Sequence, residues 1–332
     1  MEDKNNKGVA IVVPTKDRPD FVIRQMNYYA GLNSEHPIYY SDASNEENLQ
    51  KVKKEIDKLQ NRLNVNHLPS PDIDTIKRIV QLLSLVKEKY VVFIGDDDYQ
   101  PPDTLHLCAE FLENNPDYKT TLGRSVTIRV EGNQAYGNLT GVHDYPRYSI
   151  EAETASQRLT DYLGPYFTSI TAAFVPTQDL LRYLEEDIKD ISIKGELLLG
   201  CLMVAEGKHK ILDCLGLVRQ IHKSHYRLDD MFDQFTNPDW NDSYQKMRLR
   251  IVNALSATDK ITIQEAELNF KKAFWFNFQK YISKGYFDTF SKSQPQKKNV
   301  LKQARTAVAS RLPFLRKIYR NIRPLVSDKP QL

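Results

Sequence analysis

The chain has 332 residues, of which 41% are hydrophobic and 27% charged, so its composition supports a folded core and excludes global disorder. No apolar run reaches the roughly 18 residues that a membrane-spanning helix needs, and the polar start at residues 1–7 lacks the pattern of a signal peptide. We therefore expect a cytoplasmic protein. Three widely spaced cysteines without a CxxC pair indicate reduced thiols, not disulfides or a zinc site.

The net charge of +3 hides an asymmetry between the body of the chain and its end. Residues 297–332 contain ten Lys and Arg against one acidic residue, Asp328, and this surplus of +9 leaves −6 for residues 1–296. An anionic partner is therefore expected to meet the C-terminal end of the chain.

Strands and helices alternate through the first part of the chain. The apolar run at 8–14 predicts a strand buried on both faces, and apolar residues at steps of three and four predict a helix that Asn45 caps. Such alternation favours a mostly parallel sheet that binds ligands outside the carboxyl ends of its strands. The predicted strands are 8–14, 37–41, 65–67 and 90–94, and the predicted helices are 19–30, 45–63 and 74–87.

The second part of the chain is more irregular. A polar loop is predicted at 131–148, and from about residue 231 onward the pattern is helical without strands. We therefore expect two regions, a domain of alternating strands and helices at 1–230 and a helical region at 231–332. The other predicted elements are helices at 103–114, 154–163 and 177–187 and strands at 119–130 and 167–175.

Three adjacent carboxylates, Asp96, Asp97 and Asp98, follow the predicted strand at 90–94. They repel one another, and a hard divalent cation such as Mg²⁺ or Mn²⁺ would neutralise them, because these ions bind one or two carboxylates together with substrate phosphates. The alternative is a solvated acidic turn. The position of the three carboxylates at the end of a strand favours the metal site.

Three segments together resemble glycosyltransferase family 2. Residues 9–19 read VAIVVPTKDRP, residues 41–44 read SDAS, and residues 93–102 read FIGDDDYQPP. Their order and spacing are similar to the first strand and turn, the Asp-(Gly/Ala)-Ser turn and the DxD-type element of that family. The resemblance implies a GT-A (Rossmann-like) fold with a mostly parallel central sheet flanked by helices. It also implies a nucleotide-diphosphate-sugar donor, Mn²⁺ or Mg²⁺, and inversion at the anomeric carbon.

The resemblance also implies roles for individual residues. Asp97 could replace either neighbour as a metal ligand, because Gly95 stands where many relatives have the first acidic residue. Lys77 and Arg78 fall where relatives line the nucleotide site, and a solvated helix face is the alternative for them. The other implied roles are Pro14, Thr15 and Asp17 in the nucleotide pocket, Asp42 at the base or ribose, and Asp96 and Asp98 at the metal and diphosphate.

An inverting displacement needs a carboxylate that accepts the proton of the acceptor hydroxyl. Glu196 follows a glycine at a predicted loop-to-helix junction where relatives carry an acidic base, and Asp187 and Asp190 compete with it. His222 and Lys223 match loosely the region where related enzymes close over the diphosphate or the metal, so His222 is a candidate metal ligand. A structural or surface histidine is the alternative.

The C-terminal region combines aromatic and basic residues. Residues 263–286 carry more aromatic side chains than one helical stripe holds, and residues 297–323 contain nine cations and no acid among apolar residues. A basic amphipathic segment suits an anionic membrane surface. Docking on the acidic body, a contact in a homo-oligomer and nucleic-acid binding are alternatives, of which nucleic acid is not expected.

The sequence thus predicts a metal-dependent, inverting glycosyltransferase that moves a sugar to a glycan or lipid-linked acceptor in surface polysaccharide assembly, peripheral on the inner face of the plasma membrane. The chain has no QxxRW motif, which disfavours processive synthesis. A sugar nucleotidylyltransferase is one alternative, although residues 14–19 lack the glycines of a phosphate loop. A catalytically silent membrane-associated scaffold of the same fold is the other.

Overall fold

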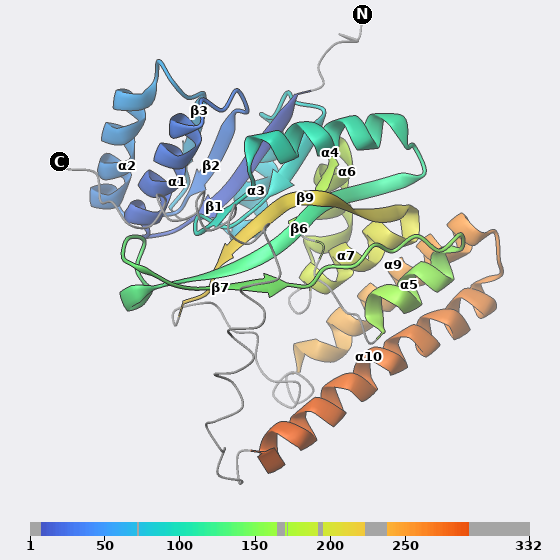
Figure 1. Cartoon of the computed structure of the whole chain (residues 1–332). Coiled ribbons are helices and arrows are strands. Elements are labelled where there is room, and N and C mark those ends of the chain that lie inside the picture. Colours follow the sequence, from blue (N-terminus) through green and yellow to red (C-terminus); the bar gives the residue numbers. More distant parts are fainter. Residues whose placement is uncertain are drawn as a thin grey trace, which may run out of the picture.

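The computed structural model describes residues 8–71, 73–164, 170, 172–191, 195–222 and 238–291 (Figure 1). The basic segment at 297–323, the expected boundary at 230/231, Lys223 and the start of the predicted strand at 167–175 lie outside the described residues. Within the described ranges, no helix is both long enough and apolar enough to cross a membrane.

The first half of the fold is a parallel sheet in the order β3-β2-β1-β4. Its centre is β1, which is buried on both faces and pairs Ile11 with Ile38 of β2 and with Val92 of β4. Helices α1, α2 and α3 connect these strands, as the alternation predicted. The bounds are β1 Val9–Thr15, α1 Pro19–Gly31, β2 Ile38–Asp42, α2 Glu46–Leu59, β3 Val65–Pro69, α3 Thr75–Leu83 and β4 Tyr90–Phe93.

The second half makes the sheet mixed. Strand β8 pairs antiparallel with β4, β6 continues the sheet, and the long strand β9 runs parallel to β6. Gly123 and Gly216 face each other there, and a Cβ on Gly216 would lie 2.5 Å from the Cα of Gly123, so the two backbones approach too closely for larger residues. The bounds are β5 Asp98–Tyr99, α4 Pro102–Asn114, β6 Tyr118–Val130, β7 Leu139–Tyr145, β8 Phe174–Pro176 and β9 Lys208–Gln220.

One predicted loop contains a strand. Strand β7, inside the segment 131–148 that was predicted as a polar loop, pairs antiparallel with β6 from Ser125↔Tyr145 to Val130↔Leu139. No residue of β7 is buried, because the strand lies at the edge of the sheet, where only Leu139 and Val142 pack, partly buried, against a small hydrophobic cluster. It therefore lacks the alternation of apolar residues on which the sequence-based prediction depended.

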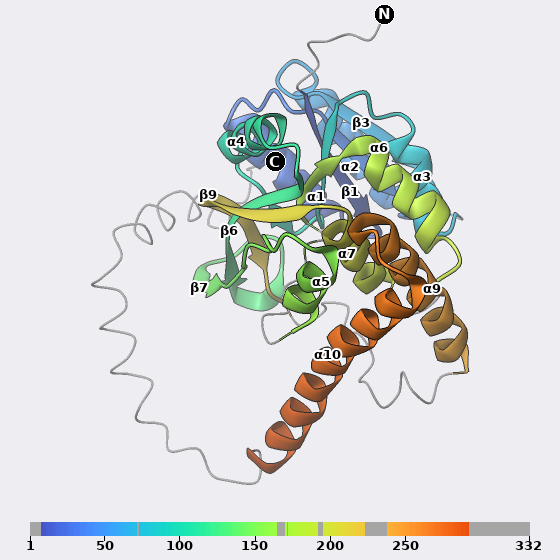
Figure 2. The same ribbon diagram turned by 90° about the vertical axis from the view of Figure 1, so that its right-hand side faces the viewer.

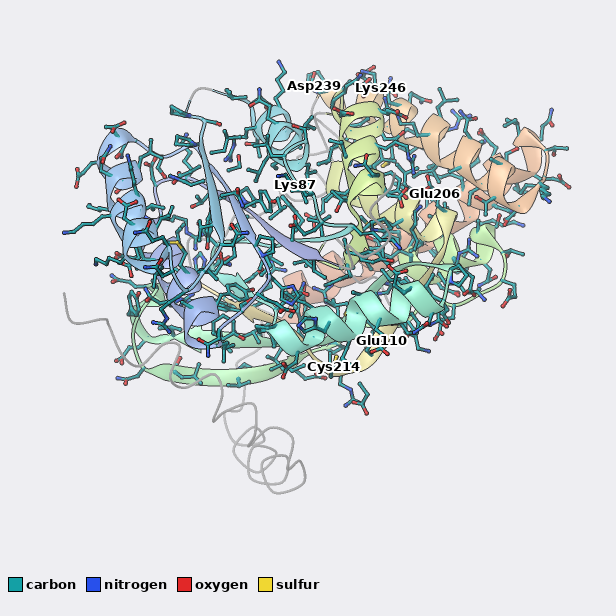
Figure 3. All side chains as sticks on the ribbon, turned by 90° about the horizontal axis from the view of Figure 1, so that it is seen from above. Lys87, Glu110, Glu206, Cys214, Asp239 and Lys246 are labelled. Atoms are coloured by element: carbon teal, nitrogen blue, oxygen red, sulfur yellow. The ribbon has the colours of Figure 1, made fainter. Side chains whose placement is uncertain are left out.

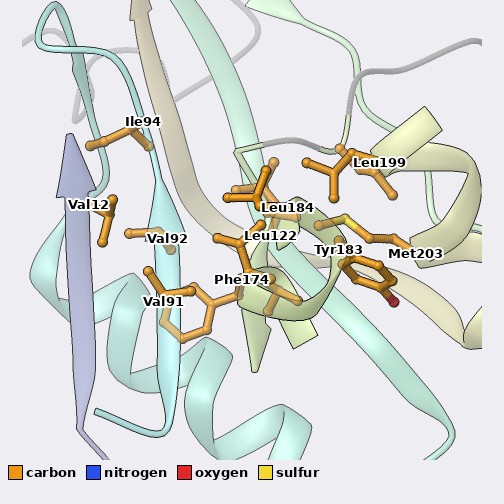
Figure 4. Close-up of a cluster of buried hydrophobic side chains, with 14 of the residues drawn as sticks. Val12, Val91, Val92, Ile94, Leu122, Phe174, Tyr183, Leu184, Leu199 and Met203 are labelled. Carbon is orange, nitrogen blue, oxygen red and sulfur yellow. The ribbon is translucent and has the colours of Figure 1, made fainter. Parts of the chain in front are cut away.

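Helices cover the other end of the sheet (Figure 1). A hydrophobic cluster joins them to the strands, with Val92 and Phe174 from the sheet against Leu184, Leu199 and Met203 from the helices (Figure 4). Figure 3 shows Glu206 and Lys246 among these helices. The bounds are α5 Ala155–Leu163, α6 Thr177–Arg182, a π-helical turn Tyr183–Ile188, α7 Gly195–Glu206, α9 Asp239–Asp259 and α10 Ile263–Ser291.

The long helix α10 packs on α5 and α9 and then extends away from the body (Figure 2). Its buried stripe, Ala266, Phe270, Ala273 and Asn277, has helical spacing. The α/β class, the flanking helices and the helical C-terminal region are thus confirmed.

Candidate functional site

Polar side chains gather where the parallel strands β1, β2 and β4 end. Thr15 at the end of β1 is paired in register with Asp42 at the end of β2. Ile94, just after β4, donates its backbone N–H to Val12 of β1, so the acidic residues that follow Ile94 lie at the same edge. This edge is where open α/β sheets bind ligands.

The residues Asp96, Asp97 and Asp98 form what we call the acid turn, between β4 and β5. Thr15 donates its hydroxyl to Asp96 Oδ2 at 2.7 Å, and Arg18 Nη1 lies 3.0 Å from Asp96 Oδ1. Arg18 Nη2 lies 3.0 Å from Asp97 Oδ2, and His222 Nε2 lies 2.5 Å from the same oxygen. Two neighbouring carboxylates therefore share one guanidinium, and an imidazole from the end of β9 completes the group.

The three carboxyls of the acid turn differ in pKa. Burial raises the pKa of Asp96 to about 6, although the charge of Arg18 opposes the shift. Burial acts in the same direction on Asp97, but the hydrogen bond with His222 and the charge of Arg18 outweigh it and hold its pKa below the ordinary value. Burial and the charge of Asp97 raise the pKa of Asp98 well above its ordinary value. Asp97 is therefore the most firmly ionised of the three.

Gln25 of α1 fixes the backbone of the acid turn. Its Nε2 donates to the carbonyls of Gly95 at 2.9 Å and Asp98 at 2.8 Å, and its Oε1 accepts the hydroxyl of Tyr40 at 2.9 Å. Gln25 and Tyr40 are completely buried. These contacts satisfy the Gln25 amide inside the protein and hold the carbonyls of the acid turn against α1.

Asp42 is the polar centre at the end of β2. It is fully buried, accepts the backbone N–H of Ser44 at 2.9 Å and pairs with His67 Nε2 at 3.0 Å. Burial alone would raise the pKa of Asp42, but the hydrogen bonds from His67 and Ser44 lower it below the ordinary value. The group is therefore held as a carboxylate with a defined orientation at the sheet edge.

Arg78 and Lys77 take different positions on α3. Arg78 is buried and donates to the carbonyls of Thr15 at 3.3 Å and Ser41 at 2.7 Å, so it holds the ends of β1 and β2 together. Lys77 is exposed, at the helix start that Asp74 caps. Of this predicted pair, the structure brings Arg78 to the strand ends that form the site.

Asp17 connects two turns at the rim of the site. Its backbone has a φ of 53°, its N–H donates to Ser44 Oγ at 2.7 Å, and its Oδ1 accepts the N–H of Asn45 at 3.0 Å. The Asp17 carboxylate is thus used at the start of α2, where Asn45 is the cap, as predicted. Pro14 pairs in register with Ser41 one residue before the strand ends.

The three candidates for a catalytic base have different surroundings. Asp190 lies 2.7 Å from Arg250 Nη2 and 3.6 Å from the ammonium of Lys246, and Asp187 lies 3.9 Å from Arg250 Nε. These two carboxylates belong to an ion-pair network that fixes α9 against the π-helical turn. Glu196 is an exposed residue in the first turn of α7.

Two residues that the sequence-based reasoning did not select, Arg18 and Gln25, contact the acid turn. Arg18 also stacks on Phe21, with its Cζ 4.1 Å from the ring centroid. Its one sequence signal is its place in the segment 9–19, directly before α1. Gln25 has no signal beyond a polar residue on a helix face that is otherwise buried, with Val22, Met26 and Tyr29 around it.

The carboxylates of the acid turn suit a metal ion that binds together with substrate phosphates. Across the described ranges, no three His, Cys, Asp or Glu side chains are placed to hold one ion by themselves. However, the Arg18 guanidinium already lies on Asp96, Asp97 and His222 as a resident cation. Oδ1 of Asp98 is buried and has no hydrogen-bond partner among the described residues. Two carboxylates plus substrate phosphates are a usual Mg²⁺ set, so the residues present fit such an ion.

Comparison with known proteins identifies the architecture. No family model and no curated protein matches the chain in sequence. The structure is similar to a fragment of TarS from S. aureus in complex with UDP, with a TM-score of 0.54 and 16% identity over 87% of this chain and 76% of that chain. The fold is GT-A-like. The same fragment in complex with UDP-GlcNAc gives a TM-score of 0.52 and 16% identity over 89% and 77% of the two chains.

We predict that Gln25→Met destabilises the protein by about 2–4 kcal/mol, because it leaves the carbonyls of Gly95 and Asp98 and the hydroxyl of Tyr40 without their buried partner. Urea denaturation at neutral pH measures the change. The control is Gln50→Met on the exposed face of α2, which should alter the unfolding free energy by less than about 0.5 kcal/mol. Equal stability of the two variants would contradict the assigned role of Gln25.

Proposed function

We propose that this protein is a metal-dependent, inverting, non-processive glycosyltransferase that uses a nucleotide-diphosphate sugar. The observation that carries the proposal is the convergence of Asp42, the acid turn and His222 at the carboxyl ends of the strands of a GT-A-like fold. TarS, whose fragment shares this fold, was crystallised with UDP and with UDP-GlcNAc. A UDP-sugar is therefore the donor class to test first.

The residues at the ends of β1 and β2 would bind the nucleoside part of the donor. Asp42, ionised and oriented by His67 and Ser44, would accept hydrogen bonds from the base or ribose. Thr15 and Pro14 would line the same pocket, with Asp17 at its rim. Arg78 would position the strand ends through their carbonyls, and Lys77 would lie at the outer edge.

Asp96 and Asp98, with His222, would hold Mn²⁺ or Mg²⁺ and the diphosphate, and Asp97 is the competing ligand because it shares Arg18 with Asp96. When bound, the ion supplies positive charge against the negative charge that grows on the departing nucleoside diphosphate. The protein holds that charge in a buried turn that Gln25 keeps in place, so little reorganisation is needed during the reaction.

The transfer itself is a single displacement. The acceptor oxygen forms a bond to the anomeric carbon on the face opposite the diphosphate, the bond from that carbon to the diphosphate oxygen breaks, and the nucleoside diphosphate leaves. Glu196 would take the proton of the acceptor hydroxyl, since Asp187 and Asp190 are engaged with Arg250. The product has the inverted anomeric configuration.

The acceptor would be a glycan or a lipid-linked sugar of a surface polysaccharide. We propose that residues 1–230 bind the donor and that residues 231–332 bring the enzyme to an anionic membrane surface at the inner face of the plasma membrane, through the segment 297–323. Helix α10 leads towards that segment in the sequence, and its Trp275 and Phe276 are more than half exposed. A homo-oligomeric contact is the competing use of the same surface.

We predict that UDP-GlcNAc with Mn²⁺ raises the thermal midpoint of the full chain, and that Asp96→Asn/Asp98→Asn removes the effect. A ligand at about 100 times its Kd adds about 2.7 kcal/mol to the stability of the native state. The matched control is Asp103→Asn/Glu110→Gln on the exposed side of α4. If no UDP-, GDP-, CMP- or dTDP-sugar shifts the midpoint, the silent scaffold becomes the better hypothesis. A shift with a nucleoside triphosphate alone would favour the nucleotidylyltransferase.

Glu196→Gln is expected to lower Mn²⁺-dependent release of UDP from UDP-GlcNAc by about 10²–10⁴-fold, because neither water nor an acceptor hydroxyl then loses its proton to a base. Donor-induced thermal stabilisation should stay as in the wild type. Glu185→Gln, an exposed carboxylate outside the ion-pair network, is the control. Unchanged turnover in Glu196→Gln would assign the base to another residue.

The membrane proposal predicts that the full chain sediments with phosphatidylglycerol vesicles and not with phosphatidylcholine vesicles. Arg316→Gln/Lys317→Gln should weaken this binding roughly 30-fold, at about 1 kcal/mol for each cation. Lys53→Gln/Lys54→Gln on the exposed face of α2 is the charge-matched control and should bind as the wild type does. Equal binding of both variants, or a salt-insensitive dimer in light scattering, would contradict the proposal.

A further inference from the structure

The guanidinium of Arg18 supplies the positive charge in the acid turn. Its Nη1 lies 3.0 Å from Asp96 Oδ1, and its Nη2 lies 3.0 Å from Asp97 Oδ2 and 3.1 Å from His222 Nε2. The guanidinium therefore contacts two carboxylates and one imidazole nitrogen at once. The carboxylate oxygens of this group are also ligands that Mn²⁺ and Mg²⁺ prefer.

Both carboxylates need a counter-charge inside the protein. Asp96 and Asp97 are 2% and 5% exposed, and an isolated buried carboxylate costs several kcal/mol. Arg18 supplies this charge from the turn between β1 and α1, where its guanidinium stacks on Phe21. A second cation in the same place would lie close to the guanidinium and be repelled by it. The two cations are therefore alternative occupants.

The side chain of Arg18 can leave while its backbone stays in place. Its side chain is 32% exposed, whereas Asp96 and Asp97 are buried. Its carbonyl accepts the N–H groups of Phe21 and Val22, which fixes the first turn of α1. The preceding residue, Asp17, is tied to Ser44 and Asn45. Rotation about the bonds of the long side chain is thus enough to free the carboxylates.

We propose that Arg18 is a resident counter-cation that releases Asp96, Asp97 and His222 when a divalent ion and the donor bind at the acid turn, and that it then pairs with the donor diphosphate. This inference rests on the proposed function. A guanidinium has donors in a planar fork that matches phosphate oxygens, so the displaced side chain gains bonds to replace those it loses. Arg18 thereby keeps the empty site compact and adds positive charge against the leaving group in the loaded one.

The test is an equilibrium titration of the full chain with Mn²⁺ alone, in which electron paramagnetic resonance measures the free ion. Arg18→Gln should bind Mn²⁺ about tenfold more tightly than the wild type, because the competing charge is gone. Arg18→Lys keeps a cation but loses the planar fork, so it should bind Mn²⁺ more tightly than the wild type and less tightly than Arg18→Gln. The control is Lys16→Gln, which removes an exposed charge from the same turn and should leave the affinity unchanged.

A second measurement tests the transfer of Arg18 to the diphosphate. Arg18→Gln should release UDP from UDP-GlcNAc about 10²-fold more slowly than the wild type at saturating Mn²⁺, in spite of its tighter metal binding. Equal or weaker Mn²⁺ binding in Arg18→Gln overturns the inference while leaving the glycosyltransferase intact, provided the wild type still responds to donor with Mn²⁺. Absence of that response in the wild type as well overturns both. Should Arg18→Gln fail to fold, Mn²⁺ binding by Arg18→Lys that is no tighter than that of the wild type overturns the exchange.

Discussion

The burial of adjacent carboxylates in the acid turn is the constraint on which the rest of the site depends. Asp96 and Asp97 cannot both be ionised inside the protein without a shared cation, and Arg18 is that cation. His222, 204 residues further along the chain than Arg18, closes the group from the end of β9. The pairing therefore fixes the β1–α1 turn, the acid turn and the end of β9 relative to one another.

The surrounding fold supplies the rigidity that this charge arrangement needs. Parallel pairing of β1 with β2 and β4 brings three strand ends to one edge, where Asp42 and the acid turn emerge. Gln25 and Arg78 then bind backbone carbonyls of these ends from α1 and α3, so two helices hold the edge in place. Preorganised polar groups of this kind stabilise developing charge without first having to reorient.

The parallel half of the fold could be predicted because its strands are buried on both faces and read as apolar runs, as β1 does. Asp42 and the acid turn follow those runs directly, so their position at one edge was predictable too. Strand β7 was not, because none of its residues is fully buried and its sequence has no regular alternation of apolar residues. The contacts of Arg18 and Gln25 with the acid turn were also hidden, since they join residues 70 or more positions apart and leave no local periodicity.

The structure gives a physical reason for a glycine at residue 95. A Cβ at residue 95 would lie 2.6 Å from Asp97 Oδ1, so an acidic residue there would displace the Asp97 carboxylate. Asp98 begins β5 and lies opposite Arg219 of β9, while Asp96 and Asp97 share Arg18. The turn thus separates two carboxylates that share Arg18 from a third on which the charge of Arg219 acts. The glycine and the downstream acids are therefore parts of one arrangement, because the room that Gly95 leaves is the room that Asp97 occupies.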